Sequence, residues 1–282
     1  MQTKRPDWLR VKLPGGEEYH RMKNLLANLH TVCEEAVCPN IGECFGQGTA
    51  TFLILGDVCT RRCNFCAVVK GVPSALEEEE PERIACAVEQ IGLRHVVITS
   101  VTRDDLPDGG AGHYAKTIKA IRTQNPTCTI EVLIPDFKGS EKALEIVLNE
   151  SPHILNHNLE TVPRLYPNVR PGADYERSLS LLEEAKKLDP ELTTKSGLIL
   201  GMGEEFHEII DVMKDLRDVG YDILTIGQYL SPGKEFLPIK RYYHPDEFKR
   251  LRNEGEKMGF RHVESGPLVR SSYHAATQFK FV

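Results

Sequence analysis

The stretch TFLILGDVCTRRCNFC, residues 51–66, joins a short apolar run to three closely spaced cysteines. The run TFLILG has the length and composition of a buried strand. Cys59, Cys63 and Cys66 follow it with the spacing C-x3-C-x2-C, and no fourth cysteine occurs in the next nineteen residues. A structural metal site normally has four protein ligands, so the rest of the chain must explain what occupies the fourth position.

The same strand-like run is the first of six along the chain. The six runs are TFLILG (51–56), HVVITS (95–100), TIEVLIP (129–135), HILNHNL (153–159), TTKSGLIL (193–200) and YDILTIG (221–227). Amphipathic stretches with helical spacing alternate with them, which predicts a parallel sheet with right-handed crossovers. Six units are two fewer than a closed barrel has, so we expect an α/β fold that forms a partial, open (β/α)6 barrel. A doubly wound sheet is the alternative.

Helix boundaries agree with this alternation. The expected boundary residues are Ser140 and Asp174 as N-caps, Pro81 and Pro245 in first turns, and Gly92, Gly220 and Gly259 at C-terminal ends. The acidic run EEEE at 77–80 is expected to be the solvated first turn of a helix. We divide the chain into an N-terminal extension (1–51), the barrel (52–260) and a C-terminal segment (261–282).

Composition excludes several classes of protein. The chain of 282 residues has 40% hydrophobic and 27% charged residues, as soluble globular proteins do. Its net charge of −6 shows no basic excess of the kind that nucleic-acid binding needs. No apolar run reaches the length of a membrane span, and the N-terminus lacks the apolar core of a signal peptide. We therefore expect a cytoplasmic protein that binds neither nucleic acid nor membrane.

Eight cysteines are present, and six of them lie between positions 33 and 66. Cys33, Cys38 and Cys44 form a second trio in the stretch CEEAVCPNIGEC, with the spacing C-x4-C-x5-C. The remaining two, Cys86 on the apolar face of a predicted helix and Cys128 just before a strand, are expected to be core or near-surface thiols.

Closely spaced thiolates suit zinc or an iron–sulfur cluster. Zinc would need a fourth ligand, such as a histidine from elsewhere in the chain, so the residues alone do not exclude a zinc site. A [4Fe–4S] cluster with one iron left open is the sharper hypothesis for residues 59–66. In α/β folds of this kind the active site lies where strands end, and the connectors there are polar: TRDDLPDGG, PDFKG, NLETVPR, GMGEE and QYLSPGKE.

Together these motifs resemble a known family. CTRRCNFC is similar to the signature of the radical S-adenosylmethionine (SAM) superfamily, and its pairing with CEEAVCPNIGEC resembles the lipoyl synthase family within it. Further stretches carry the resemblance from about residue 30 to 276: ITSVTRDDLPDGGAGHY, NHNLETVPRLY, VRPGADYERSL, KSGLILGMGE and VRSSYHAA.

The resemblance implies two [4Fe–4S] clusters and SAM as cofactors. Cys59, Cys63 and Cys66 would hold the radical-generating cluster, whose open iron binds the amino and carboxylate groups of SAM. Reductive cleavage of SAM then yields a radical that removes hydrogen from an unactivated carbon. The implied activity is that of a sulfurtransferase, which inserts sulfur at C6 and C8 of an octanoyl chain amide-linked to a lysine of a carrier domain.

The resemblance also implies that the second cluster is sacrificial and supplies both sulfur atoms. Cys33, Cys38 and Cys44 would hold it, with a serine of the RSSY motif as fourth ligand; this serine matches Ser272, with Ser271 as the neighbouring alternative. A hard alkoxide holds iron less firmly than a soft thiolate, so that iron is the easier one to release. Arg270 would pair with a cluster sulfide, with a carboxylate or in a surface salt bridge.

Residues that contact SAM are less evident, because ITSVTRDD departs from the GGE-like stretch of the superfamily. Glu131 and Asn158, polar residues inside predicted strands, are the candidates, although a helix cap or a neighbouring strand could satisfy them instead. His153, His157 and His207 show no metal-ligand grouping.

Implied partners are octanoylated lipoyl-carrier domains, such as those of 2-oxoacid dehydrogenase E2 and the glycine cleavage H protein, and an electron donor such as ferredoxin or flavodoxin. Residues 1–32 carry six Lys or Arg and three Asp or Glu, a net charge of +3 that could attract an acidic carrier. Another dual-cluster radical SAM enzyme and a non-enzymatic electron carrier are the alternative functions.

Overall fold

A computed structural model describes residues 5–278. The described chain divides into two compact units. The first comprises residues 11–61 and 67–155, and the second comprises residues 5–10, 62–66 and 156–278. No helix among the described residues is both long and apolar enough to cross a bilayer.

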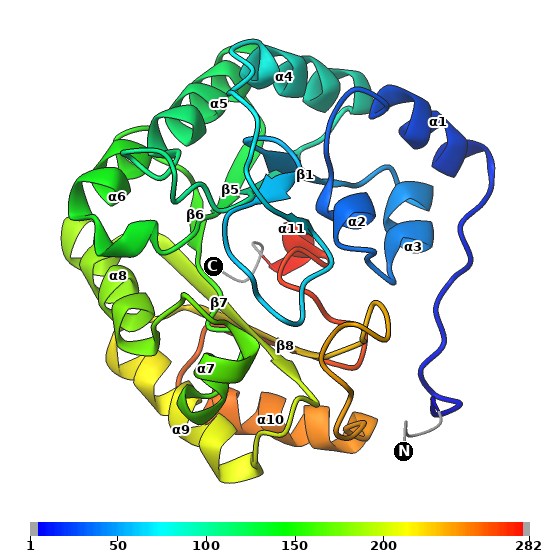
Figure 1. The fold of residues 1–282 in the computed structure, drawn as a ribbon, viewed down its shortest axis with the longest axis vertical. Helices are drawn as coiled ribbons and strands as arrows, with labels where there is room; N and C mark the ends of the chain where they lie inside the picture. Colours follow the sequence, from blue (N-terminus) through cyan, green and yellow to red (C-terminus); the bar gives the residue numbers. More distant parts are fainter. Residues whose placement is uncertain (1–4, 279–282) are drawn as a thin grey trace. The chain divides into compact units, whose positions relative to one another are not determined.

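Three short helices precede the first strand of the first unit, and strands then alternate with longer helices. Its helices are α1 (Glu17–Leu25), α2 (Val32–Glu35), α3 (Ile41–Gly46), α4 (Glu80–Ile91), α5 (Ala111–Gln124), the 3-10 turn η1 (Phe137–Gly139) and α6 (Glu141–Leu148). Its strands are β1 (Thr51–Ile54), the two-residue β2 (Val58–Cys59) and β3 (Val69–Lys70), β4 (His95–Ser100) and β5 (Thr129–Leu133). Figure 1 shows α4 and α5 packed side by side.

The second unit continues the alternation. Its helices are the 3-10 turn η2 (Pro163–Leu165), α7 (Tyr166–Val169), α8 (Tyr175–Leu188), α9 (Phe206–Asp218), α10 (Pro245–Lys257) and α11 (Ala275–Gln278). Its strands are β7 (Thr193–Leu200), β8 (Ile223–Gln228) and β9 (His262–Ser265), while β6 (Ile154–Asn156) lies at the boundary between the units. In Figure 1, β7 and β8 lie next to each other.

Seven strands form one parallel sheet in the order β1-β4-β5-β6-β7-β8-β9. Ile54 pairs with Ser100 and Thr99 with Leu133, so β1, β4 and β5 end at the same level. Leu200 likewise pairs with Gln228 at the ends of β7 and β8. Among the described residues β1 and β9 are the two edges, so the sheet is open, as the alternation of six strands and helices predicts.

All six predicted strands are present. β9, with the sequence HVES, is a seventh that the periodicity did not predict, because Val263 is its only aliphatic residue. The predicted N-caps are also confirmed. The Ser140 side chain accepts a hydrogen bond from the amide of Ala143, and the Asp174 side chain accepts one from the amide of Arg177.

Two expectations for helix α4 are wrong. Cys86 is exposed, because it lies two residues from both Ile84 and Val88 and therefore on the opposite face of the helix. The acidic run is not wholly solvated either. Glu80 is 5% exposed, and its carboxylate accepts from the amide of Leu55 at 2.9 Å.

Apolar side chains build a core within each unit. In the second unit, fully buried residues of β7 and β8 such as Leu198 and Ile226 pack with Ile209, Met213 and Leu216 of α9. Each such side chain contributes about 1.5–3 kcal/mol by its burial. The core fixes the strands, and the loops at the strand ends carry the polar residues described next.

Candidate metal centres

The upstream cysteine trio lies on two short helices and the turn between them. Cys33 is in α2, which Thr31 caps by accepting from the amide of Glu34 at 3.3 Å. The amide of Cys38 donates to the carbonyl of Cys33 at 3.1 Å, and Cys44 lies in α3. The sequence therefore folds locally so that all three cysteines belong to one compact segment.

The three upstream thiols influence one another electrostatically. Burial raises the pKa of the Cys33 thiol, and the neighbouring Cys38 and Cys44 raise it further. Burial, followed by the charge of Cys38, raises the pKa of Cys44 to about 11. Thiols with a raised pKa, as at Cys33 and Cys44, need a bound cation or cluster to become thiolates at neutral pH. The donor set therefore fits a metal centre.

This trio is not arranged around a single ion. Among the described residues, only one group of three His, Cys, Asp or Glu side chains has its ligand atoms within 4.8 Å of one another, and that group contains no cysteine. Four thiolates around one zinc at about 2.3 Å would lie roughly 3.8 Å apart. A cluster of several irons holds its thiolates farther apart than a single ion does, so a cluster does not require this spacing.

The downstream trio follows β1, and the chain passes from one unit to the other within it. In the first unit, the amide of Thr102 donates to the sulfur of Cys59 at 3.4 Å, and the amide of Gly71 donates to the Cys59 carbonyl at 3.0 Å. Hydrogen bonds to a coordinating sulfur are one of the features that set the reduction potential of an iron–sulfur cluster. The environment of Cys59 therefore fits a cluster ligand.

In the second unit, Cys63 and Cys66 lie on a turn in which the amide of Cys66 donates to the carbonyl of Cys63 at 3.3 Å. Asn64 anchors this turn. Its amide donates to the carbonyl of Val169 at 2.9 Å, and its side-chain nitrogen donates to the carbonyl of Asn168 at 2.7 Å. These two hydrogen bonds fix the turn to α7.

Arg61, between Cys59 and Cys63, holds the loop to the ends of two strands. Its Nε is 2.8 Å from Oδ2 of Asp104, and its Nη2 is 3.0 Å from Oδ1 of Asp104 and 2.5 Å from Oδ1 of Asp136. Thr60 adds a hydrogen bond from its hydroxyl to the carbonyl of Thr102 at 2.9 Å. Planar guanidinium–carboxylate pairing of this kind fixes orientation as well as position.

A buried polar group follows β6 in the second unit. The Asn158 Nδ2 donates to Oε1 of Glu160 at 2.9 Å, and Arg170 donates to the Asn158 carbonyl at 2.9 Å. Burial raises the pKa of Glu160, and the positive charges of Arg170 and Arg270 oppose this shift. Although burial lowers the pKa of Arg170, the charges of Tyr166, Glu160 and Cys63 outweigh that effect and raise it.

The side-chain oxygen of Asn158, Oδ1, is buried and has no hydrogen-bond partner among the described residues. A side chain at Gly197 would place its Cβ 2.8 Å from that oxygen and 2.7 Å from Oγ1 of Thr225, so only glycine leaves room for these two polar atoms. A buried acceptor that lacks a donor fits a polar ligand group, such as a hydroxyl or an ammonium.

Comparisons with known proteins agree with this arrangement. The family model of the radical SAM superfamily matches residues 53–216, and that of the N-terminal domain of lipoyl synthase matches residues 1–38. A lipoyl synthase from Rubrobacter xylanophilus is 59% identical over 276 residues, covering 97% of this chain and 86% of the relative. The chain belongs to the lipoyl synthase family. A second lipoyl synthase, from Caldanaerobacter subterraneus, is 56% identical over 98% of this chain and 97% of the relative.

Solved structures show the same fold at low identity. HydG, a maturase of the [FeFe]-hydrogenase, aligns with a TM-score of 0.59 at 14% identity, over 74% of this chain and 49% of its own. Methylornithine synthase aligns with a TM-score of 0.55 at 14% identity, over 72% of this chain and 60% of its own. These similarities establish the radical SAM fold. The cofactors of the lipoyl synthase family are therefore SAM and two [4Fe–4S] clusters.

The remaining predicted site residues lie in different surroundings. Glu131 is fully buried in β5, and its Oε2 is 3.3 Å from Nε2 of His95 on the neighbouring strand. Ser272 follows β9 in the second unit, where its carbonyl accepts from the amide of Ala275 at 3.3 Å. Ser271 and Ser272 are both half-buried. Nη1 of Arg270 donates to the carbonyl of Val269 at 2.7 Å, and the positive charge of Arg270 acts on Glu160.

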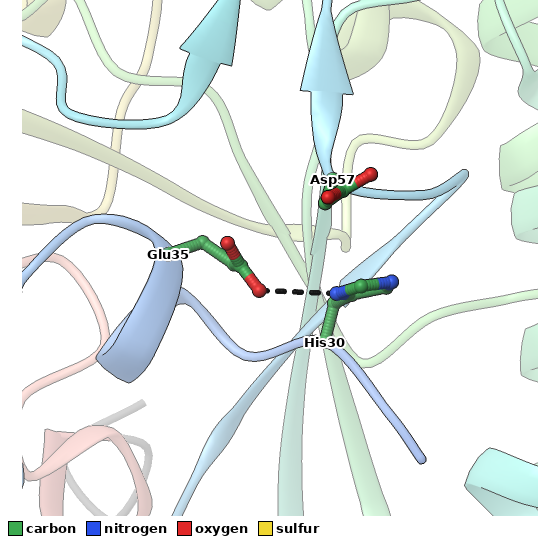
Figure 2. A group of neighbouring side chains, drawn as sticks. All are labelled: His30, Glu35 and Asp57. Atoms are coloured by element: carbon green, nitrogen blue, oxygen red, sulfur yellow. Dashed lines mark hydrogen bonds and ion pairs between the residues drawn. The ribbon is translucent and has the colours of Figure 1, made fainter. Parts of the chain in front are cut away.

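One group of potential ligands was missed by sequence reasoning. His30, Glu35 and Asp57 lie together in the first unit (Figure 2), and none of the three is among the predicted site residues. The signal that could have found them is their position, since each is within three residues of a cysteine of a trio. Closeness in sequence to the cysteine trios is therefore a better indicator of these ligands than the spacing of histidines.

Proposed function

We propose that this protein is a lipoyl synthase that inserts sulfur at C6 and C8 of an octanoyl chain amide-linked to a lysine of a carrier domain. The observation that carries the proposal is the pair of cysteine trios in a chain that belongs to the lipoyl synthase family. When bound, one cluster supplies an electron for the cleavage of SAM, and the other supplies the sulfur. The side chains of this protein contribute by binding and orienting these groups.

Cys59, Cys63 and Cys66 would hold the cluster that reacts with SAM. Three cysteines leave one iron open, and the fourth position belongs to SAM. Arg61 contributes by holding the loop between these cysteines in one orientation through its pairs with Asp104 and Asp136. A fixed loop keeps the reacting groups aligned, which is the main contribution that protein side chains make to such chemistry.

Asn158 is proposed to contact SAM through the unpaired oxygen in front of Gly197. Glu160 and Arg170 orient the Asn158 amide by occupying its nitrogen and its backbone carbonyl. Glu131 remains a second candidate, and its contact with His95 offers a purely structural reason for its burial.

Cys33, Cys38 and Cys44 would hold the sulfur-donor cluster, with Ser272 as its fourth ligand. The raised pKa values of Cys33 and Cys44 mean that these thiols ionise fully only when iron is bound. Assembly of this cluster therefore releases protons and depends on the metal. Such a centre suits a cluster that is dismantled in each reaction cycle and rebuilt afterwards.

Octanoylated lipoyl-carrier domains are the proposed protein substrates, represented by 2-oxoacid dehydrogenase E2 and the glycine cleavage H protein. A small redox protein such as ferredoxin or flavodoxin is the proposed electron donor. Arg5 and Arg10 at the basic N-terminal end are exposed, as docking of an acidic carrier requires. Lys4, another residue of this basic stretch, lies outside the described residues.

The test uses anaerobically reconstituted protein, octanoylated carrier, SAM and a chemical reductant. Two clusters should give about eight iron and eight sulfide per chain. Mass spectrometry of the carrier should show two added sulfur atoms. Replacing Cys59, Cys63 and Cys66 with alanine should abolish SAM cleavage, whereas the same change at Cys33, Cys38 and Cys44 should preserve cleavage and prevent sulfur insertion. Dehydrogenated carrier without sulfur, or stoichiometric zinc, would contradict the proposal.

A further inference from the structure

His30, Glu35 and Asp57 form a compact group of metal-ligand atoms outside both cysteine trios (Figure 2). The ligand atoms of the three side chains all lie within 4.8 Å of one another. Nδ1 of His30 is 3.0 Å from Oε1 of Glu35. Two ligands at right angles, each about 2.1 Å from one ion, are roughly 3 Å apart, so this pair already has the separation of adjacent ligands.

The backbone holds each of these residues in place. The carbonyl of His30 accepts from the amide of Leu53 in β1 at 2.9 Å, and the neighbouring Thr31 pairs with Phe52. Glu35 is the last residue of α2, and its amide donates to the Thr31 carbonyl at 2.9 Å. Asp57 lies three residues beyond the end of β1 and directly before β2. The three side chains therefore converge from elements that are hydrogen-bonded together.

The group carries an excess of negative charge. The group includes two carboxylates, with an oxygen of each within 4.8 Å of the other, and within residues 5–278 no lysine or arginine forms an ion pair with Glu35 or with Asp57. The carboxylate of Glu77, which also interacts with His30, is paired with Arg83. Like charges at this distance repel, and a divalent cation would remove the repulsion. The side chains of His30 and Glu35 are 39% and 26% exposed, so an ion could reach them and keep water in its remaining positions.

We propose that His30, Glu35 and Asp57 bind one divalent first-row transition-metal ion, with ferrous iron as the physiological occupant. One imidazole nitrogen and two carboxylate oxygens form a donor set that suits Fe²⁺, Mn²⁺ and Zn²⁺. The site is distinct from both clusters because it contains no thiolate.

The role of the site rests on the proposed function. A cluster that gives up its sulfur must be rebuilt, and rebuilding requires iron close to Cys33, Cys38 and Cys44. Glu35 ends the short helix that carries Cys33. A site of three hard or borderline ligands holds ferrous iron more weakly than a set of thiolates does, so iron can pass to the cysteines as Fe²⁺ by ligand exchange. A [4Fe–4S]²⁺ cluster contains two ferric ions, so a one-electron acceptor then oxidises two of the four irons. The cysteine protons are released to water as the thiolates bind.

Binding is tested on protein that already holds both clusters, so that the cysteines are occupied. Mn²⁺ is the probe, because its free ion has an electron paramagnetic resonance signal that decreases on binding, and Fe²⁺ is the competitor. The intact protein should bind one Mn²⁺ per chain, and Fe²⁺ should displace it. Glu35→Gln and Asp57→Asn should each weaken binding by roughly tenfold or more.

Glu34→Gln is the matched control, because Glu34 lies on the same helix but its carboxylate already pairs with Lys23. This variant should bind Mn²⁺ as the intact protein does. The visible spectra of the clusters show whether each variant is folded. No stoichiometric Mn²⁺ binding by the intact protein, or equal weakening in Glu34→Gln and Asp57→Asn, would overturn the proposed site.

A second measurement addresses the role. After one round of sulfur insertion, Fe²⁺, sulfide and a mild one-electron oxidant are added, and the return of the donor cluster is followed by its absorbance. Asp57→Asn should rebuild the cluster several-fold more slowly at limiting Fe²⁺, and excess Fe²⁺ should restore the rate. Equal rates at every Fe²⁺ concentration would refute the role but leave the binding site intact. Failure of the intact protein to form product would refute the proposed function instead, without affecting the Mn²⁺ result.

Discussion

Arg61 and Asp136 form a buried ion pair, in which Nη2 of the arginine is 2.5 Å from Oδ1 of the aspartate and the two side chains are 7% and 1% exposed. The pair connects the loop between Cys59 and Cys63 to the turn that follows β5. Asp136 also accepts from the amide of Lys138 at 3.1 Å, which places its carboxylate. The orientation of the loop proposed to bind a cluster thus depends on a residue 75 positions away in the sequence.

We predict that Asp136→Asn lowers the free energy of unfolding by about 3 kcal/mol, as the loss of one partner of a buried ion pair does. The asparagine can still accept from the amide of Lys138, so the change isolates the charge. Chemical denaturation of the protein measures the effect. Asp105→Asn is the control: Asp105 pairs with Arg103 at 2.8 Å but is 39% exposed, so its loss should cost less than about 1 kcal/mol. Equal losses in the two variants would refute the special role of Asp136.

The turn before Cys38 contains a strained residue that provides a second prediction. Val37 has φ of 49°, a left-handed conformation that a β-branched side chain rarely adopts, and it is 64% exposed. Left-handed backbone costs an L-residue roughly 1–2 kcal/mol, whereas glycine adopts it freely but loses more entropy on folding. Val37→Gly should therefore raise the free energy of unfolding by about 0.5–1 kcal/mol.

The control for this change is Val69→Gly. Val69 is likewise exposed, at 55%, but it lies in β3 and is not among the residues of positive φ. Glycine there should destabilise the protein, because it adds entropy to the unfolded chain and removes no backbone strain. If both variants shift the denaturation midpoint in the same direction, the backbone at Val37 is not strained.

The sequence predicted those features that depend on local pattern. Each of the six apolar runs became a strand, since a run such as HVVITS can be buried on both faces only within a sheet covered by helices. β9 was missed because a four-residue strand with one aliphatic side chain has no period to detect. Both cysteine trios could be recognised because the three cysteines of each lie close together in the sequence.

Features that depend on tertiary contacts were not predictable in this way. The pairing of Arg61 with Asp136 requires two loops to meet, and no spacing in the sequence encodes that contact. His30, Glu35 and Asp57 converge because α2 and β1 are hydrogen-bonded through Thr31 and Phe52. Glu80 was expected in solvent because its neighbours are acidic, yet its carboxylate is buried beside His113 at 2.7 Å.

A pH-dependent contribution to stability is expected from Glu208. Its hydrogen bond from Arg164, at 2.7 Å between Nε and Oε1, lowers the pKa of the carboxyl from 4.5 to about 2. Because the folded-state pKa is below the unfolded value, the stabilisation is present above pH 4.5 and is lost as the pH falls toward 2. Solvent screens this pair, since Arg164 is 55% exposed.

Glu208→Gln should therefore destabilise the protein by less than about 1 kcal/mol at pH 7. Below pH 2 the carboxyl of Glu208 is protonated in the folded protein too, so the difference in stability should shrink as the pH falls toward 2 and vanish below it. Urea denaturation at a series of pH values provides the measurement, with cluster-free protein used throughout. A difference that stays constant from pH 7 to pH 2 would show that packing, and not charge, is responsible.

The last prediction concerns Ser272 as a ligand of the sulfur-donor cluster. Its motivation is the absence of a fourth cysteine near CEEAVCPNIGEC and the match of residues 270–273 to the RSSY motif of the lipoyl synthase family. A bound metal ion lowers the pKa of a coordinated hydroxyl, as it does for water, so the serine can bind as an alkoxide. Ser272→Cys should keep the cluster assembled, bind that iron more firmly and suppress sulfur release.

Ser272→Ala should instead leave that iron without a protein ligand and make the cluster labile. Both effects are measured on protein in which Cys59, Cys63 and Cys66 are alanine, so that only the donor cluster contributes to the spectrum. Sulfur insertion is measured with those cysteines intact. Ser271→Ala is the control, because Ser271 is half-buried in the same segment and should be replaceable without effect. Wild-type spectra and full insertion of both sulfur atoms in Ser272→Cys and Ser272→Ala would exclude Ser272 as the ligand. A labile cluster in Ser271→Ala would instead assign the ligand role to Ser271.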